Sequence, residues 1–368
     1  MDYLFPSGIA EGNSFCNRMK ERKKFKQSIE RIEHTVVVAP RRYGKTSLIT
    51  KVMQEMDIAY GWIELLSATS LESVQTKIIN AVGGLVYELA PDIKKLQLKF
   101  KQFFIALKPD IVLSALGQKV VLHPLSSSAE TITATLLELD RYVLSLNKKA
   151  VIVFDEFQQL AELENSRALE ASIRYAVERS KAVSYIFSGS NRHMLVEMFG
   201  ASERPLYRLC NMFGLERIAP KEYFSFLKKA ALQQWQAPLD EAVFSKIMEL
   251  TERHPYYVNI LCNRLWKYDN LPNVDRVEKA WDKYVTSHKS IIVGDILNLS
   301  LNQRKILTML AQHPTAEPYG AEFQSKTGVS LSSMKQAFGV LIDKDMVYRD
   351  NGVLTVLDPA IRYYLGNY

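Results

Sequence analysis

The sequence predicts an α/β fold in which a parallel sheet carries helices on both faces and is followed by an α-helical region and a winged-helix domain. Two observations carry this prediction. In the first 219 residues, short apolar runs typical of buried parallel strands alternate with segments of helical apolar spacing. The segment 288–368 instead contains three helical stretches followed by two short strands around Asp350-Asn351-Gly352, which is a hairpin signal.

The first apolar strand, near 34–38, runs through a tight turn into a helix, and Gly44-Lys45-Thr46 stands at the junction. Backbone N–H groups around Gly44 and the positive end of the following helix form a cradle for phosphate oxygens. Lys45 would reach the β- and γ-phosphates, and Thr46 would hold Mg²⁺. Ala39 replaces the first glycine of the G-x-x-x-x-G-K-[ST] pattern, whereas Gly44, where the backbone must approach phosphate closely, is kept. The alternative is an ordinary helix N-terminus after a buried strand. The predicted phosphate-binding loop consists of Pro40, Arg41, Arg42, Tyr43, Gly44, Lys45, Thr46 and Ser47.

Polar groups also follow two later strands. The run 149–154 reads as a buried strand and ends at Asp155 and Glu156. Asp155 would bind the magnesium shell, and Glu156 would polarise the water that attacks the γ-phosphate. The run 183–187 leads to Ser190, which would orient that water, and Arg192, which would neutralise charge developing on the γ-phosphate. The alternatives are an exposed acidic pair that begins a helix and, for Arg192, a surface turn.

These residues resemble those of the prokaryotic P-loop ATPases of the AAA-like and STAND group, whose archaeal and bacterial branch has a helical lid and a winged helix. The resemblance implies ATP rather than GTP, and no Asn-Lys-x-Asp motif for guanine occurs. It also implies that Asn17 and Arg18 border the adenine and that Pro255 packs on the base from the lid. Many relatives have glycine where this chain has Arg253. Pro255 can alternatively be read as the first turn of a lid helix. The segments that carry the resemblance are 15–18 with Glu21, 40–48, 154–158, 189–193, 254–257 and 358–359.

The predicted domains are a P-loop ATPase core, a helical lid and a winged-helix domain, which cover 1–219, 220–287 and 288–368. The core includes an insertion at about 71–125, which we expect to be helical from Leu71 to about Leu107 and then to form a hairpin. A final core strand is expected at 213–218.

Composition limits the classes of function. With 368 residues, of which 47% are hydrophobic, the chain can bury a large core. Its three cysteines have no C-x-x-C spacing, which favours a reducing compartment and argues against a zinc site. No apolar run has the length of a signal peptide or a membrane span, so we expect a cytoplasmic protein without membrane contact. The net charge of +7 permits nucleic-acid binding without requiring it, because basic runs such as 18–26 are usually solvated faces.

The sequence thus predicts a Mg²⁺-dependent ATPase that acts as a molecular switch, with the lid and winged helix responding to ATP or ADP. A protein partner or self-association is expected. One alternative is a DNA-associated ATPase whose winged helix contacts duplex DNA. Another is a scaffold that binds ATP and a protein partner but hydrolyses little. Whether Arg192 acts in its own site or in that of a neighbouring subunit stays open.

Overall fold

The structure is a computed structural model that describes residues 4–90, 109–113, 120–124 and 128–367. The chain divides into two compact units. The first, here called the sheet unit, comprises Met19–Ala39 and Leu48–Leu215. The second, here called the helical unit, comprises Met1–Arg18, Pro40–Ser47 and Glu216–Tyr368. Each unit is described separately.

A five-stranded parallel sheet organises the sheet unit, as the sequence predicts. The strand order is β2-β5-β6-β1-β7, and all four neighbouring pairs are parallel. β1 therefore lies in the interior of the sheet, between β6 and β7. Apolar residues fill the inner strands because these are covered on both faces. The strands are β1 Thr35–Val38, β2 Tyr60–Glu64, β5 Ala150–Asp155, β6 Val183–Gly189 and β7 Asn211–Gly214.

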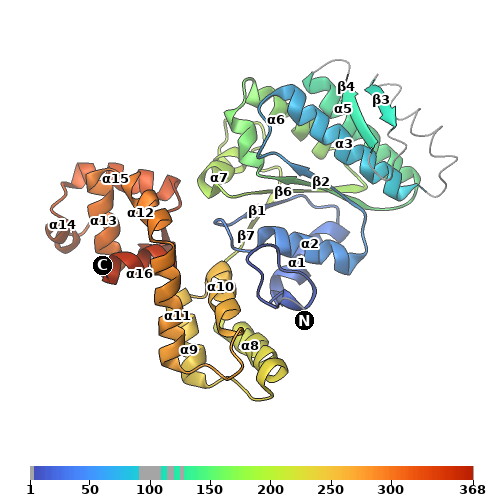
Figure 1. The fold of residues 1–368 in the computed structure, drawn as a ribbon. Coiled ribbons are helices and arrows are strands. Elements are labelled where there is room, and N and C mark those ends of the chain that lie inside the picture. Colours follow the sequence, from blue (N-terminus) through green and yellow to red (C-terminus); the bar gives the residue numbers. More distant parts are fainter. Residues whose placement is uncertain (1–3, 91–108, 114–119, 125–127, 368) are drawn as a thin grey trace. The chain divides into compact units, whose positions relative to one another are not determined.

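Helices cover both faces of this sheet, which confirms the predicted layering. Figure 1 shows α3, α5 and α6 on one face and α1 and α2 on the other. The buried aromatic rings of Phe154 on β5 and Phe187 on β6 stack with centroids 5.3 Å apart. Phe157 packs edge-on against Phe187 at 4.7 Å and extends this cluster toward the end of the strands. The helices are α1 Met19–Glu30, α2 Lys45–Met56, α3 Leu71–Leu89, α5 Ala129–Ser145, α6 Ser166–Val177 and α7 Arg192–Gly200.

The final core strand differs from the expected 213–218. β7 spans Asn211–Gly214 instead, because its ladder partner β1 has only four residues and pairs Thr35 with Asn211 and Val38 with Gly214. One further hydrogen bond, from Leu215 N–H to the Val38 carbonyl, ends the pairing. The chain then leaves the sheet and enters the helical unit at Glu216.

The insertion contains both expected kinds of structure. α3 begins at Leu71, as predicted, and ends at Leu89. The remainder of the predicted helix, 91–107, lies outside the described residues. The expected hairpin is present as β3 Pro109–Leu113 and β4 Val120–Pro124, which pair antiparallel.

After Glu216, the helical unit continues with four helices, α8 to α11, in the segment that the sequence predicts to be a helical lid. Three of the C-terminal helices and the hairpin β8–β9 also match the predicted segments, but α12 and α16 were not predicted. α12 was missed because Ile291 and Leu297 are exposed, so its apolar residues do not mark one buried face. The elements are α8 Pro220–Trp235, α9 Glu241–Thr251, α10 Pro255–Leu265, α11 Val274–Ser287, α12 Lys289–Leu297, α13 Leu301–Gln312, α14 Ala321–Thr327, α15 Leu331–Asp343, β8 Val347–Asp350, β9 Val353–Val356 and α16 Pro359–Asn367.

A single apolar cluster holds these helices together. The fully buried Trp281 of α11 and Phe338 of α15 both belong to it, so α8–α11 and α13–α16 share one core. Thr315 forms an isolated antiparallel bridge with Leu354 and so adds a third short segment to the β8–β9 hairpin. In the part of the chain that the structure describes, no helix combines the length and the hydropathy needed to cross a bilayer.

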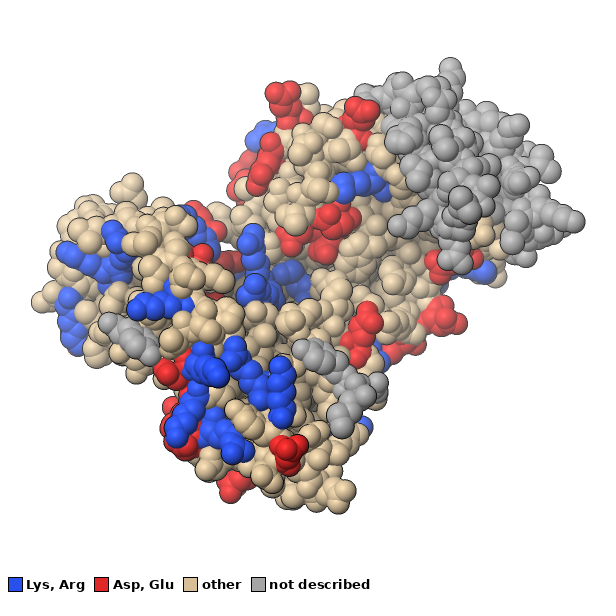
Figure 2. Space-filling view, viewed as in Figure 1, with Lys and Arg blue, Asp and Glu red and all other residues tan. Residues whose placement is uncertain are grey.

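The basic run on α1 is only partly a solvated face. Arg22 and Lys26 both pair with Glu55 of α2, and the Lys26 distance is 2.9 Å. Arg18, which precedes the helix, has only 2% of its surface exposed. Figure 2 shows Lys and Arg side chains gathered over α9 to α11 on the face drawn, with acidic side chains at the margin. Positive surface charge is therefore not confined to α1.

A buried carboxylate shapes the turn that leads into β6. Asp140 on α5 is 7% exposed. Its Oδ1 accepts hydrogen bonds from the backbone N–H groups of Ala182 at 2.8 Å and Val183 at 3.0 Å, and from Ser180 Oγ at 2.6 Å. This carboxylate satisfies buried donors that have no ladder partner, so it fixes where β6 begins.

We expect Asp140→Ala to lower the free energy of unfolding by roughly 2–4 kcal/mol, because it leaves the N–H groups of Lys181 and Ala182 without their acceptor, whereas Val183 N–H keeps Ser180 Oγ. Asp140→Asn keeps one acceptor oxygen and should lose less. Glu138 on the same helix is a matched control, because its carboxylate pairs with the exposed Arg141, and Glu138→Ala should cost less than about 0.5 kcal/mol. Urea denaturation measures all three, and equal losses for Asp140→Ala and Glu138→Ala would contradict the assignment.

Candidate functional site

The predicted phosphate-binding loop follows β1 after Ala39, and its last three residues, Lys45–Ser47, form the first turn of α2. Two residues in it have positive φ, Arg42 at 63° and Gly44 at 86°. Glycine adopts this conformation without strain, so Gly44 fits the position that the motif requires. The left-handed residues turn the chain sharply between the strand and the helix. The backbone thus has the strand-turn-helix form that a phosphate cradle needs.

Side chains of the loop are mostly held in place. Lys45 is 7% exposed, and its Nζ donates to the Pro40 carbonyl at 3.0 Å, so the lysine curls over its own loop. Ser47 Oγ accepts a hydrogen bond from Ala10 N–H at 2.9 Å. Thr46 is partly buried at the first turn of α2. A pre-ordered loop of this kind loses little conformational entropy when a ligand binds.

The Arg18 side chain forms hydrogen bonds with the backbone of the phosphate-binding loop. Its Nη2 donates to the Tyr43 carbonyl and to the Glu216 carbonyl, each at 3.0 Å. Both Arg18 and its neighbour Asn17 have positive φ, 48° and 39°. By the resemblance given above, these two residues are expected to border the adenine. The structure brings Arg18 to the loop backbone, a contact that no sequence motif signals.

The helical unit also brings the loop to the His254-Pro255-Tyr256 segment. The Arg42 guanidinium lies 4.2 Å from the centroid of the Tyr256 ring, and Tyr43 packs edge-on against His254 at 4.8 Å. Pro255 occupies the first turn of α10, as one of the two sequence interpretations has it. Arg253 has φ of 61°, a left-handed backbone conformation that glycine adopts without strain.

His254 is a neutral ring in this contact. It is 5% exposed, and burial, followed by the cations Arg217 and Arg42, lowers the pKa of His254 to about 3. The imidazole therefore carries no charge at physiological pH. It acts as a packing surface between the loop and α10.

In the sheet unit, Asp155 and Glu156 stand at the carboxyl end of β5. The Asp155 Oδ1 accepts hydrogen bonds from Ser188 Oγ at 2.5 Å and from Glu156 N–H at 3.1 Å. Glu156 has φ of 52°, and such a left-handed residue costs about 1–3 kcal/mol unless its surroundings hold it. Backbone strain of this kind clusters at functional sites.

The structure brings Ser190 to Glu156, two residues that the sequence places after different strands. Glu156 Oε2 accepts hydrogen bonds from Ser190 Oγ at 2.8 Å, from Ser190 N–H at 3.2 Å and from Gln158 Nε2 at 2.6 Å. The parallel pairing of Phe154 with Phe187 places the two strand ends side by side. Three donors on one oxygen fix the direction of the carboxylate.

Two residues of this cluster were missed as functional candidates. Gln158 is 4% exposed, and a Cβ on Gly189 would lie 1.9 Å from its Oε1, so a side chain at 189 would displace the Gln158 amide. Ser188 holds Asp155. The position of Ser188 near the carboxyl end of β6 is the signal that could have found it, because polar side chains at the carboxyl ends of parallel strands lie at the ligand-binding edge of such sheets.

Arg192 is the first residue of α7, next to Asn191, whose Oδ1 accepts the Met194 N–H at 3.0 Å and caps the helix. The arginine is partly buried. It follows Ser190 by two residues at the same end of β6. Its position therefore fits a site at the carboxyl edge of the sheet.

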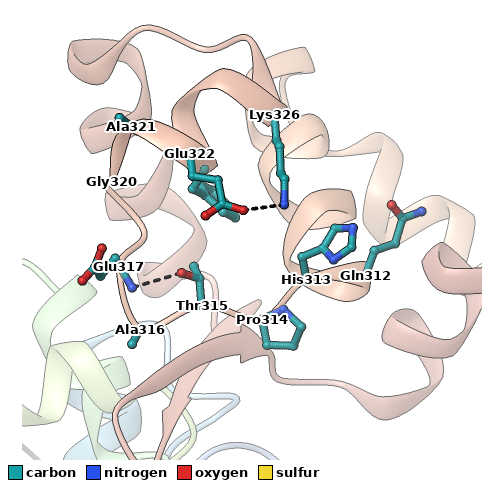
Figure 3. A pocket seen from close by; sticks show the side chains of 11 residues that line it. Gln312, His313, Pro314, Thr315, Ala316, Glu317, Gly320, Ala321, Glu322 and Lys326 are labelled. Carbon is teal, nitrogen blue, oxygen red and sulfur yellow. Dashed lines mark hydrogen bonds and ion pairs between the residues drawn. The ribbon is translucent and has the colours of Figure 1, made fainter.

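A cavity of about 600 Å³ lies in the C-terminal part of the helical unit. Residues between Gln312 and Lys326 line it, and none of them is a predicted site residue. Figure 3 shows Glu322 and Lys326 of α14 paired at its wall; their N–O distance is 2.7 Å. Its polar side chains are exposed to solvent. The arrangement offers no set of buried groups converging on a ligand.

Known proteins are similar to this chain in fold but not closely in sequence. No protein-family model matches this sequence, and no curated protein matches it. The chain is similar to a Walker-type ATPase of Pyrococcus abyssi, with a TM-score of 0.69 and 18% identity over 98% of this chain and 99% of the other. It is also similar to the ORC2 protein of Aeropyrum pernix, solved as ADPNP and ADP complexes. That TM-score is 0.60, with 12% identity over 99% and 96% of the two chains. The parallel sheet, the loop after β1 and these likenesses together show that the chain has the P-loop nucleoside triphosphatase fold.

Proposed function

We propose that this protein is a Mg²⁺-dependent ATPase of the AAA-like and STAND kind, with residues 220–287 as a lid and 288–368 as a winged-helix domain. The observation that carries the proposal is the pair of features that follow the carboxyl ends of strands in one parallel sheet. A Gly-Lys-Thr loop follows β1. β5 ends at Asp155, which accepts a hydrogen bond from Ser188 of β6, and the next residue, Glu156, accepts one from Ser190, which follows β6. Open α/β sheets bind ligands at this edge.

The nucleotide is proposed to be ATP. The neighbouring folds include a Walker-type ATPase and a protein solved with ADPNP and ADP, and both names concern adenine nucleotides or their hydrolysis. Lys45, together with the N–H groups of the loop, would bind the phosphates. Arg42 already stacks on Tyr256, so this cationic and aromatic pair would border the nucleotide with Pro255.

Oxygen ligands available here suit magnesium. The Thr46 hydroxyl and the Asp155 carboxylate are hard donors of the kind that Mg²⁺ prefers, and Ser188 fixes the direction of Asp155. Magnesium would neutralise charge on the phosphates when bound.

The reaction is proposed to rest on Glu156 as the group that polarises water. Its Oε2 is fixed by Ser190 and Gln158, which leaves the carboxylate oriented rather than free to rotate. Ser190 would orient the same water, and Arg192 would stabilise the charge that develops on the γ-phosphate.

A switch is the proposed output. The phosphate-binding loop, α8–α11 and the C-terminal helices belong to one compact unit, so a change at the loop has a physical route to both helical regions. Nucleotide binding would favour one arrangement of these elements over another.

We expect Lys45→Ala to weaken Mg²⁺-ATP binding about 100-fold or more, because it removes a charge-assisted bond to phosphate. Isothermal titration calorimetry measures this loss. Lys51 is a matched control on the same helix, where it pairs with Glu55 at 3.4 Å, and Lys51→Ala should bind ATP as the native protein does. Equal affinity of Lys45→Ala and the native protein would refute the phosphate-binding role.

Glu156→Gln should bind ATP but lower turnover about 100-fold or more, because an amide cannot accept the proton of the attacking water. Steady-state phosphate release measures turnover, and binding is measured in parallel. The exposed Glu164 provides the control, since Glu164→Gln removes one carboxylate a few residues away without touching Ser190 or Gln158. Unchanged turnover in Glu156→Gln would remove Glu156 from the reaction.

Turnover per chain should stay constant as protein concentration rises, because Ser190, Glu156 and Arg192 lie at one end of neighbouring strands in the same chain. Phosphate release measured over a 100-fold range of protein concentration tests this expectation. A rise in turnover per chain would instead mean that a neighbouring subunit completes the site.

A further inference from the structure

Arg217 joins four separate segments of the helical unit. Its side chain is 5% exposed. Nε donates to Tyr43 Oη at 3.1 Å, Nη2 donates to the Leu357 carbonyl at 2.8 Å, and Nη1 donates to Glu252 Oε2 at 2.8 Å. The guanidinium carbon also lies 4.4 Å from the centroid of the Tyr348 ring. One planar cation therefore ties the phosphate-binding loop to the end of α9, to β8 and to the residues that precede α16.

Glu252 extends this set of contacts into α16. Its second oxygen, Oε1, accepts a hydrogen bond from Arg362 Nη1 at 3.0 Å. Its backbone carbonyl also accepts from Arg217 Nη1 at 2.9 Å. Tyr43, Arg217, Glu252 and Arg362 thus form a continuous polar chain, here called the Arg217 relay.

The Arg217 relay joins its segments by hydrogen bonds and ion pairs rather than by apolar packing. Buried ion pairs stabilise a fold weakly compared with apolar side chains of the same volume, because both charges lose hydration. They are, however, strongly directional, and a guanidinium offers five donors in one rigid plane. An ion pair that adds little stability but requires a defined arrangement of its partners is suited to coupling the movements of the segments that it joins.

At the phosphate-binding loop, the Arg217 relay begins with Tyr43, which directly precedes Gly44 and Lys45. Tyr43 is 3% exposed, and its carbonyl is held by Arg18 while its hydroxyl is held by Arg217. A movement of Tyr43 would therefore break the bond to Arg217 or carry Arg217 with it. Either event disturbs Glu252 and Leu357, which contact the same guanidinium.

We propose that Arg217 is a positioning residue that couples the phosphate-binding loop to β8 and α16, so that nucleotide at the loop and the arrangement of the C-terminal helices depend on each other. The inference rests on the proposed ATP-binding function and adds the residues through which the switch acts. Coupling is reciprocal, so if bound nucleotide favours one arrangement of α16, that arrangement of α16 must in turn favour nucleotide binding.

The test uses Arg362→Gln, which breaks the bond to Glu252 at the far end of the relay. Arg362 is a partly exposed residue of α16, and its side chain bonds to Glu252 and to the Ala311 carbonyl rather than to the phosphate-binding loop. We expect Arg362→Gln to weaken Mg²⁺-ATP binding about 5-fold by calorimetry. In the background of Tyr43→Phe, which removes only the hydroxyl that receives Arg217, the same change should alter affinity by less than about 2-fold.

Two controls separate the relay from general effects on the fold. Lys326→Gln breaks an exposed ion pair of the same unit, with Glu322, and should leave ATP affinity unchanged. Tyr223→Phe removes a buried hydroxyl that has no hydrogen-bond partner among the described residues, and should not reduce the effect of Arg362→Gln. A purely structural role of the relay predicts that Arg362→Gln acts alike in the native protein and in the Tyr43→Phe variant, and that outcome would overturn the proposal.

Hydrogen exchange gives a second readout that does not depend on Tyr43→Phe folding. Saturating ATP should change amide exchange across 357–367 in the native protein at least about 5-fold, and this response should disappear in Arg362→Gln. A native protein that binds ATP with no response in 357–367 would overturn the relay alone. A native protein that binds no ATP would overturn the proposed function, and the relay with it.

Discussion

The parallel hydrogen bonding of β5, β6 and β1 is the constraint on which the rest of this structure depends. Because all three strands run in the same direction, their carboxyl ends lie at one edge of the sheet. At that edge the register sets Phe154 beside Phe187, so the residues that follow them, Asp155 and Ser188, fall within hydrogen-bonding distance. A shift of one residue would turn these side chains to the opposite face.

Several features at this edge of the sheet are unfavourable for folding. Glu156 adopts a left-handed backbone, Gln158 is buried, and Gly189 leaves the room that the Gln158 amide occupies. Three donors to Glu156 Oε2 offset the strain and keep the carboxylate in one orientation. The apolar cluster of Phe154, Phe157 and Phe187 behind it supplies a rigid base. This combination of strain and rigid support is consistent with the proposed role of Glu156.

The helical unit uses a different physical device. Its apolar core joins α8–α11 to the C-terminal helices, but the contacts with the phosphate-binding loop are made largely by polar and aromatic side chains. The hydrophobic effect has no preferred direction, whereas the hydrogen bonds of Arg217 depend on distance and angle. We therefore regard the core as the source of stability and the Arg217 relay as the proposed source of coupling.

Local patterns in the sequence determined most of the strands and helices and the main residues of the candidate site. Apolar runs bounded by turns located the strands, and Gly44-Lys45-Thr46 and Asp155-Glu156 marked the candidate site, because strand length, loop chemistry and charge are local properties. Tertiary structure decided the rest. The order of the strands, the short β7, the bond of Ser190 to Glu156 and the contacts of Arg18 and Arg217 join residues distant in the chain. Arg217 reads as the end of a strand by its neighbours, and only the folded chain brings Tyr43, Glu252 and Leu357 around it, because no local period encodes contacts over 35 to 174 residues.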